Sequence, residues 1–190
     1  IERMAGGNPE LTNDGETFLA TLDPSEPLTV QTITATVGAG FNPNVPFVIS
    51  GSTAPADGKQ AVLLDARALP SGTLIQVDNI DFVAIVGAVR VIGGAGQNIA
   101  SGDSSAQWIV LGADDDVIHG GGGNDTIGSL GGADQLFGDA GDDVVFGGDG
   151  NDMLSGGEGS DHLNGGTGFD AAQQEGRRSD YQILLEGSGI

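Results

Sequence analysis

The chain of 190 residues contains no cysteine, so neither disulfide bonds nor thiolate-bound metals hold its fold. Basic residues are also scarce: six Lys and Arg stand against 27 Asp and Glu, which gives a formal net charge of −21. This charge repels nucleic acids and anionic membrane surfaces, so we expect neither as a direct partner. No apolar run reaches the roughly 18 residues that cross a membrane, and we therefore expect no membrane insertion.

Catalytic motifs are missing as well. The sequence has no HExxH, GxSxG or GxxxxGK[ST] pattern and no cysteine nucleophile, which predicts that the chain is not an enzyme. Its two histidines, His119 and His162, fall on outward positions of opposite sheets in the repeat register described below, so they cannot share a metal. No basic-then-apolar leader follows Ile1 and no evident export signal precedes Ile190, and we expect the chain to be a piece of a longer protein.

Glycine, by contrast, is abundant, with 35 residues, and it recurs with a fixed period between Gly93 and Gln173. This stretch divides into nine consecutive nonapeptides without insertion or deletion. The clearest units read GGGGNDTIG from Gly120, GGDGNDMLS from Gly147 and GGEGSDHLN from Gly156. Glycines lie near positions one, two and four, a carboxylate at position six and an aliphatic residue at position eight. Glycine permits tight turns, and the last three residues suffice for a short strand with one inward side chain.

One such unit cannot bury its aliphatic side chain alone, so the units must coil and stack, two per turn. The sequence therefore predicts an all-β fold, a parallel β-roll (solenoid) of nine nonapeptide repeats. The sixth positions are Asn98, Gln107, Asp116, Asp125, Asp134, Asp143, Asp152, Asp161 and Asp170. The eighth positions are Ala100, Ile109, Ile118, Ile127, Leu136, Val145, Leu154, Leu163 and Ala172.

The stacked register places the Asp of one unit over the Asp 18 residues later, beside carbonyl groups of the glycine turns. Residues 93–173 contain thirteen Asp and one Glu but no Lys or Arg, so these carboxylates repel one another unless cations bind. Carboxylate and carbonyl oxygens in a flexible cage suit calcium better than magnesium. About five to seven Ca²⁺ ions would offset most of the charge of the repeats.

On these residues, Gly93–Gln173 resembles the calcium-binding RTX (hemolysin-type) repeat family, whose GGxGxDxUx unit folds as a parallel β-roll. The resemblance implies that each ion takes carbonyls at positions one and three and the carboxylate of one unit, with carbonyls at positions two and four and the carboxylate of the unit two later. The implied side-chain ligands are Asp116, Asp125, Asp134, Asp143, Asp152, Asp161 and Asp170, with Asn98 as an amide candidate. The implied carbonyl donors are Gly120, Gly122, Ser129, Gly131, Gly132, Gly138, Asp139, Ala140, Gly141, Gly147, Gly148, Asp149, Gly150, Gly157, Gly159, Gly166 and Gly168.

Two positions depart from this pattern. Five Asp pairs satisfy it, namely 116/134, 125/143, 134/152, 143/161 and 152/170. Asn98 under Asp116 and Gln107 under Asp125 offer an amide instead, so whether these two positions bind calcium stays open. Ser129 and Leu130 replace two glycines that would donate only carbonyls. The remaining acidic residues of the repeats lie off position six and are expected to be exposed: Asp103, Asp114, Asp115, Asp139, Asp142, Asp149 and Glu158.

The rest of the chain is predicted as a β-rich N-terminal segment (1–79) that caps the roll, non-calcium capping rungs (80–92), the roll (93–173) and a C-terminal cap strand (174–190). Turn signals dominate residues 1–27, where only 18–22 resembles a strand, and no helix of ordinary length is predicted. Strands are predicted at 28–37, with a bulge between Val30 and Ile33, and at 46–50, 60–66 and 73–77. Repeat register places Phe82 and Val91 inward.

For function, the resemblance implies a noncatalytic structural module of a secreted or cell-surface bacterial protein, such as an adhesin, surface-layer or extracellular matrix component. It also implies type I secretion, with folding on calcium binding outside the cell. The alternative is an accessory roll of an extracellular enzyme, a protease, lipase or polysaccharide epimerase, whose catalytic domain lies elsewhere. A carbohydrate-binding flank is a third hypothesis, although the repeats offer aromatics without Lys or Arg, which disfavours anionic polysaccharide.

One outward stripe is apolar. Val110, Gly128 and Phe146 stack in one column of the sheet formed by the even-numbered units, beside Trp108. We interpret residues 28 to 77 as its cover; the alternatives are another chain, through self-association or a cell-surface partner, and scattered surface hydrophobes that need no cover.

Overall fold

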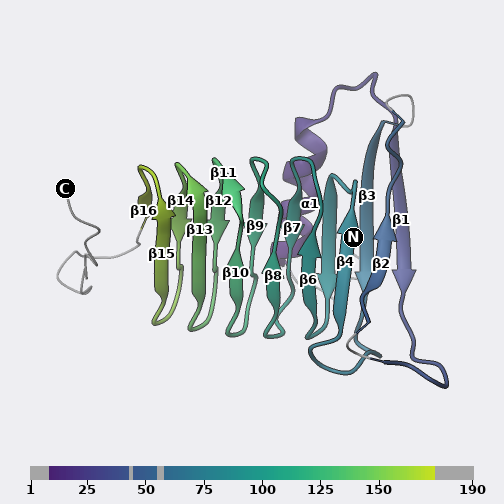
Figure 1. Ribbon diagram of the computed structural model, residues 1–190. Helices are drawn as coiled ribbons and strands as arrows, with labels where there is room; N and C mark the ends of the chain where they lie inside the picture. Colours follow the sequence, from purple (N-terminus) through teal and green to yellow (C-terminus); the bar gives the residue numbers. More distant parts are fainter. Residues whose placement is uncertain (1–8, 43–44, 55–57, 174–190) are drawn as a thin grey trace.

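A computed structural model describes residues 9–42, 45–54 and 58–173, which form a parallel β-solenoid with one helix against its side (Figure 1). Sheet A contains, in spatial order, β1 (Leu28–Thr34), β3 (Lys59–Asp65), β5 (Phe82–Val86), β7 (Ile99–Ser101), β9 (Val117–His119), β12 (Gln135–Phe137), β14 (Met153–Ser155) and β16 (Ala171–Gln173). Sheet B contains β2 (Phe47–Ser50), β4 (Leu74–Asp78), β6 (Arg90–Gly93), β8 (Trp108–Val110), β10 (Thr126–Gly128), β13 (Val144–Gly150) and β15 (His162–Thr167), with the short β11 (Gly131–Gly132) beside the second half of β13.

The predicted parallel β-roll is confirmed. Every strand pair is parallel, and the repeat strands pair at the predicted 18-residue spacing, as Ala100 with Ile118 and Ile127 with Val145. From Ala100 to Leu154 each eighth-position side chain is at most 1% exposed and belongs to one continuous core between the sheets. The period of the sequence therefore fixes both the strand register and the buried residue of each half-turn.

Residues before Gly93 continue the same solenoid. The predicted strands at 46–50, 60–66 and 73–77 form β2, β3 and β4, each within a residue or two of its expected bounds. Strands β1 and β2 stand at the ends of sheets A and B (Figure 1). The interpretation that residues 28 to 77 cover the outer face of sheet B is therefore wrong, because these residues lengthen both sheets instead of lying across one.

The cover lies on the other sheet and is a helix. The prediction of turns and a short strand before residue 28 is wrong, since Pro9–Thr21 forms α1, which packs on β5 and β7 of sheet A. Its buried face consists of Leu11, Asp14, Gly15 and Phe18, at helical spacing. Only two of these four residues are large and apolar, so the helical pattern is hidden in the sequence. Packing against the sheet stabilises a segment whose Asn-Asp-Gly triplet otherwise signals a turn.

Phe82 faces this helix instead of the roll interior, contrary to prediction. Val83, not Phe82, pairs with Ala100, whereas Val91 pairs with Ile109 as expected. The half-turn between β5 and β6 is thus one residue shorter than a nonapeptide; it is closed by a hydrogen bond from Val89 N–H to Gly87 O of 3.0 Å, with Gly87 at φ 117°. Phe82 stacks on Phe18 with ring centroids 5.0 Å apart.

The predicted bulge in the first strand is absent. Strand β1 pairs with β3 residue by residue from Leu28 to Thr34. The change of apolar phase has another cause: Ile33 packs into the roll core, whereas Leu28 packs on the outer cluster under α1 and Val30 is exposed. The C-terminal cap strand expected in 174–190 lies outside the described residues, and the proposed division of the chain at 79, 92 and 173 stays a prediction. Within the described part of the chain, no helix has the length and apolarity that a membrane span requires.

Candidate metal centre

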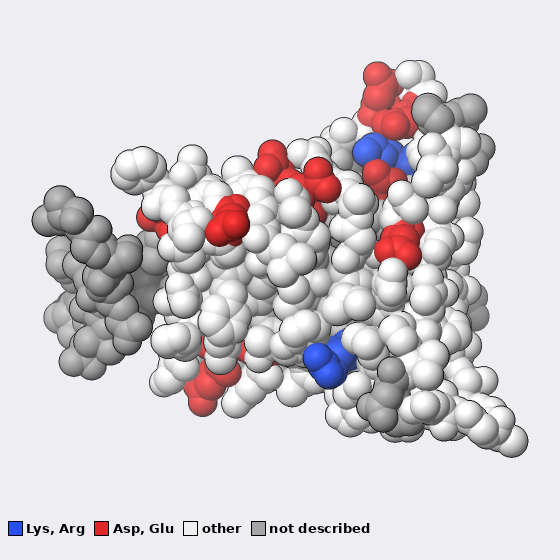
Figure 2. All heavy atoms as spheres, in the orientation of Figure 1, with Lys and Arg blue, Asp and Glu red and all other residues white. Residues whose placement is uncertain are grey.

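The sixth-position residues form two columns, one along each turn edge of the solenoid. The odd edge carries Asn98, Asp116, Asp134, Asp152 and Asp170, and the even edge carries Gln107, Asp125, Asp143 and Asp161. Each column arises because the residue before every three-residue strand falls at the same point of the turn. In Figure 2 carboxylates gather along the edges, and the sheet face between them is almost free of charge.

One carboxylate oxygen of each sixth-position Asp accepts a hydrogen bond from the backbone of the coil before it. The sixth-position N–H of one unit donates to Oδ1 of the sixth-position Asp 18 residues later, and this bond recurs seven times at 2.7–3.1 Å. These bonds fix the carboxylate orientation throughout both columns. The predicted pairs 116/134, 125/143, 134/152, 143/161 and 152/170 are therefore direct neighbours.

The second carboxylate oxygen has no hydrogen-bond partner among the described residues. Oδ2 is buried and without a hydrogen bond in the sixth-position Asp of five consecutive units, namely Asp116, Asp125, Asp134, Asp143 and Asp152. These side chains are only 1–2% exposed. A buried carboxylate oxygen without a hydrogen bond destabilises the folded state. Because five such oxygens recur along both edges, we infer that each binds the same kind of ligand.

Position-one glycines leave the space that such a ligand needs. A Cβ atom added at Gly120 would lie 2.8 Å from Asp125 Oδ2 and 2.7 Å from the carbonyl oxygen of Gly138, so a side chain would fill the gap between them. The relation recurs where Gly138 faces Asp143 and the Gly156 carbonyl, and where Gly147 faces Asp152 and the Gly165 carbonyl. Carboxylate and carbonyl oxygens thus converge on a glycine-lined gap, which is the donor set that calcium prefers.

The electrostatics favour the same ligand. Burial raises the pKa of Asp116 and of Asp125 to about 7 and that of Asp143 to about 6, with the neighbouring carboxylates adding to the shift. The pKa values of Asp134 and Asp152 are raised as well, chiefly by burial. Hydrogen bonds from the preceding backbone N–H oppose these shifts. A column of buried carboxylates with like charges requires bound protons or bound cations to be stable.

The structure shows the direction of the carbonyls at three of the four repeat positions that the predicted donors occupy. Position-two carbonyls accept N–H bonds from position three of the unit two later: Gly121 O from Ala140, and Asp139 O from Glu158, at 2.8 and 2.7 Å. A carbonyl oxygen has a second lone pair, so this bond does not exclude a metal contact. Position-one and position-four carbonyls point along the stack, since added Cβ atoms at Gly120 and Gly168 would meet the carbonyls of Gly138 and Gly150.

Three non-glycine residues keep the turn geometry of two turns. Asp139 stands at a position-two site with φ 71°, and its carboxylate accepts the Gly121 N–H and contacts His119 Nδ1, both at 3.2 Å. Ser129 stands at position one, where its hydroxyl donates to the Gly112 carbonyl at 2.9 Å, while Leu130 is exposed. The backbone course of both turns therefore survives these replacements.

The expectation that Asp103 is exposed is wrong. Its side chain is 9% exposed, because Oδ2 accepts the Gly87 N–H at 3.1 Å and Oδ1 accepts the Gln107 amide at 2.8 Å. The remaining off-position acids are exposed or half-buried, namely Asp114, Asp115, Asp139, Asp142, Asp149 and Glu158. His119 and His162 lie on sheets A and B respectively, as predicted.

Sequence periodicity also missed the upstream end of the odd column. Asp81 pairs in register next to Asn98, and Gln60 next to Asp81, but at spacings of 17 and 21 residues. A search at a fixed period of 18 does not find them. Lys59 and Asp81 carry opposite charges, but 22 residues separate them, and only the aligned strands bring the two side chains to 2.8 Å.

Across the described ranges, no three His, Asp or Glu side chains converge as a metal-binding group. A cation at either edge would therefore take two carboxylates from successive coils and complete its shell with backbone carbonyls. The fold and these columns define a class: a parallel β-solenoid with a column of carboxylates, suited to calcium, along each turn edge.

Comparison with known families agrees with this class. The family model described as RTX calcium-binding nonapeptide repeat (4 copies) matches residues 101–136 and residues 137–171. These two segments are RTX calcium-binding nonapeptide repeats. No curated protein and no solved structure matches the chain.

Proposed function

We propose that this chain is a noncatalytic structural module of a secreted or cell-surface bacterial protein, and that calcium drives its folding outside the cell. The observation that carries the proposal is the repetition of buried, unpartnered Asp Oδ2 atoms beside glycine-lined gaps. Each bound ion would join coils that are 18 residues apart in sequence, so ion binding and coil stacking would be one event. The resulting rod would present its partners or flanking domains at a fixed spacing.

Charge supports folding outside the cell. The repeats contain fourteen acidic and no basic side chains between residues 93 and 173, and about five to seven divalent ions would offset most of this charge. At low calcium the columns of like charge oppose stacking. A chain that stays unfolded where calcium is scarce is suited to transit through an export channel, and an adhesin, surface-layer or matrix role would follow from its folding at the surface.

A calcium titration followed by circular dichroism tests this proposal. The β-sheet signal of the wild-type chain should rise cooperatively with calcium and fall again with excess chelator. Gly120→Ala should shift the calcium midpoint upward at least about tenfold, because its methyl group fills the gap between Asp125 and the Gly138 carbonyl.

Gly122→Ala is the matched control. Gly122 lies in the same turn, neither glycine has a positive φ, and the nearest atom to its added Cβ is 3.4 Å away, an ordinary contact. Its calcium midpoint should stay close to wild type. Magnesium at equal concentration should substitute poorly, because it demands a small octahedral shell. A full β signal in chelator, or equal midpoints for the two alanine variants, would reject the proposal.

A further inference from the structure

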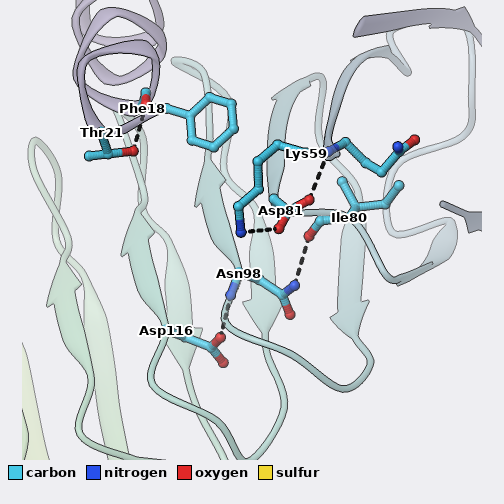
Figure 3. Close-up of polar contacts among 8 residues, drawn as sticks. Phe18, Thr21, Lys59, Ile80, Asp81, Asn98 and Asp116 are labelled. Atoms are coloured by element: carbon cyan, nitrogen blue, oxygen red, sulfur yellow. Dashed lines mark hydrogen bonds and ion pairs between the residues drawn. The ribbon is translucent and has the colours of Figure 1, made fainter. Parts of the chain in front are cut away.

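At the upstream end of the odd column, a lysine of the protein compensates the charge of the carboxylate. Asp81 occupies the sixth-position register there, and its Oδ2 accepts the Gln60 N–H at 2.7 Å, as Asp116 Oδ1 accepts the Asn98 N–H at 2.8 Å. The other oxygen of Asp81 contacts the Lys59 ammonium at 2.8 Å (Figure 3). A cation of the protein itself therefore compensates Asp81 in this coil.

Asn98 separates this lysine-compensated coil from the carboxylate column. Its amide nitrogen donates to the Ile80 carbonyl at 2.7 Å, on the side away from Asp116 (Figure 3). This bond fixes the amide orientation, because an oxygen in that place would face the carbonyl oxygen of Ile80. Asn98 Oδ1 is then buried without a partner, in a residue only 6% exposed.

Gln107 repeats the arrangement on the even edge. Its amide nitrogen donates to the Gly87 carbonyl at 3.1 Å and to Asp103 Oδ1 at 2.8 Å, and both acceptors again orient the amide. Gln107 Oε1 is buried and unpartnered, in a residue only 4% exposed. A Cβ atom added at Gly102 would meet both Gln107 Oε1 and the Gly120 carbonyl, which is the relation that Gly120 has to Asp125 and Gly138. The odd edge differs here, because a Cβ atom added at Gly93 would meet the buried Leu111 side chain, so only the unpartnered amide oxygen supports the Asn98 rung.

Each amide thus presents a donor to the coil before it and a bare acceptor to the coil after it. An Asp or Glu would turn a second oxygen toward the Ile80 or Gly87 carbonyl, where the preceding coil supplies no calcium gap. A neutral amide avoids that repulsion and still offers an oxygen that calcium accepts as a ligand.

We propose that Asn98 and Gln107 are the boundary rungs of the calcium ladder, each giving its amide oxygen to the first ion on its edge. This inference rests on the proposed calcium-dependent role. It raises the ion count from the five Asp pairs to seven sites, one for each of the seven sixth-position hydrogen bonds. The first two ions would connect the metal-free coils to the repeats.

Ion counting by native mass spectrometry of the calcium-loaded chain tests the proposal. Wild type should hold seven ions, and Asn98→Leu and Gln107→Met should each lose one. Asn98→Asp and Gln107→Glu keep the ligand oxygen and should retain seven ions, with lower thermal stability than wild type because their second oxygen faces the Ile80 or Gly87 carbonyl. Gln135→Met, at an exposed glutamine on β12, is the control and should retain seven.

Terbium luminescence gives a second, local readout. Trp108 is the single tryptophan of the chain and directly follows Gln107, so it is the nearest donor for a terbium ion at the Gln107 rung. Gln107→Met should lower tryptophan-sensitised terbium emission strongly, and Asn98→Leu, on the opposite edge, should lower it much less.

The outcomes separate the two proposals. Five ions in wild type, or seven in both Asn98→Leu and Gln107→Met, would overturn the boundary rungs and leave calcium-driven folding intact. Sensitised terbium emission at the wild-type level in Gln107→Met would likewise overturn the even-edge rung. A wild-type chain that binds no calcium would reject the proposed function itself.

Discussion

The N-terminal coils and the repeat coils have the same parallel geometry but different interiors. Strand β5 is buried at all five positions, because Val83 and Ile85 face the roll core while Phe82, Ala84 and Val86 face α1. A repeat strand buries one aliphatic side chain between the sheets and leaves its outer face to solvent or partly so, as in β12.

The difference shows two ways of stabilising one coil. The N-terminal coils that contain β3 and β5 use apolar burial on both faces of these strands, and where a carboxylate enters the edge column it is paired with Lys59. The repeat coils have a narrow core and columns of unpaired carboxylate oxygens. Their stability should therefore depend on calcium, whereas that of the N-terminal coils should not.

The largest expected effect is regional unfolding in chelator. Hydrogen exchange followed by mass spectrometry should show loss of protection across strands β8 to β16, while α1 and strands β1 to β5 keep theirs. Adding calcium back should restore the repeats. Uniform loss of protection along the chain, or none at all, would show that the two regions are not stabilised differently.

Phe82→Ala tests the complementary expectation, that the stability of the N-terminal coils does not depend on calcium. It removes the ring that stacks on Phe18 beneath α1 and should cost about 3–5 kcal/mol of unfolding free energy for this region. The loss should be equal in calcium and in chelator, because no edge column contains Phe82. Phe169→Ala, at a side chain 91% exposed, should have little effect in denaturant titrations. A Phe82→Ala effect that appears only in calcium would contradict the separation of the two regions.

The repeats were predictable because their signal is periodic and local. A fixed spacing with glycine at the turns predicts the coil, the buried eighth position and the carboxylate columns from Asp116 to Asp170. Asn98 and Gln107 could be placed in those columns but not assigned a role, since the role depends on which carbonyl the amide nitrogen reaches. That partner, Ile80 O or Gly87 O, lies in coils of irregular length.

The N-terminal region was less predictable because tertiary contacts decide it. Helix α1 has Asp14 and Gly15 on its buried face, and the Asp14 carboxylate accepts a hydrogen bond from Ser101 Oγ at 2.5 Å across 87 residues of sequence. No local pattern reveals such a contact. Phe82 was placed inward because the short half-turn at Gly87 changes the register by one residue, and a one-residue change moves each side chain to the other face.

Within the repeats, position along the column should set the effect of a substitution. Asp143→Ala should lower the calorimetric calcium stoichiometry by up to two ions, since Asp143 pairs with Asp125 on one side and Asp161 on the other. Asp170→Ala, at the exposed end of the column, should remove one. Asp142→Ala, exposed and off position six, is the control. Equal losses for Asp143→Ala and Asp170→Ala would contradict the stacking register.

Acid should stabilise the calcium-free repeats. The pKa values of Asp116 and Asp125, about 7 in the fold, exceed the ordinary value of 3.8, so the folded columns bind more protons than the unfolded chain between these limits. The calcium-free repeats should therefore gain stability as pH falls through this window and lose it as pH rises. The β-sheet signal in excess chelator should therefore be larger at about pH 5.5 than at about pH 8, and the calcium midpoint of folding should not rise between them, because the unfolded carboxylates carry few protons above about pH 5. A signal in chelator that stays the same at both pH values would contradict the raised pKa values.

The smallest expected effect lies at the junction of the two regions. Arg90, on the last N-terminal strand of sheet B, places its guanidinium 4.6 Å from the centre of the Trp108 ring on the first repeat strand. Arg90→Ala should cost about 0.5–1 kcal/mol, as expected for a partly exposed cation–π contact, and should make Trp108 fluorescence easier to quench with iodide or acrylamide. The difference from wild type should be present in calcium and absent in chelator, because the Trp108 strand should form only with the ladder.

Arg67→Ala, which removes an exposed pair with Asp65, controls for the change in charge. Equal quenching of wild type and Arg90→Ala in calcium would mean that this contact does not hold the junction in solution.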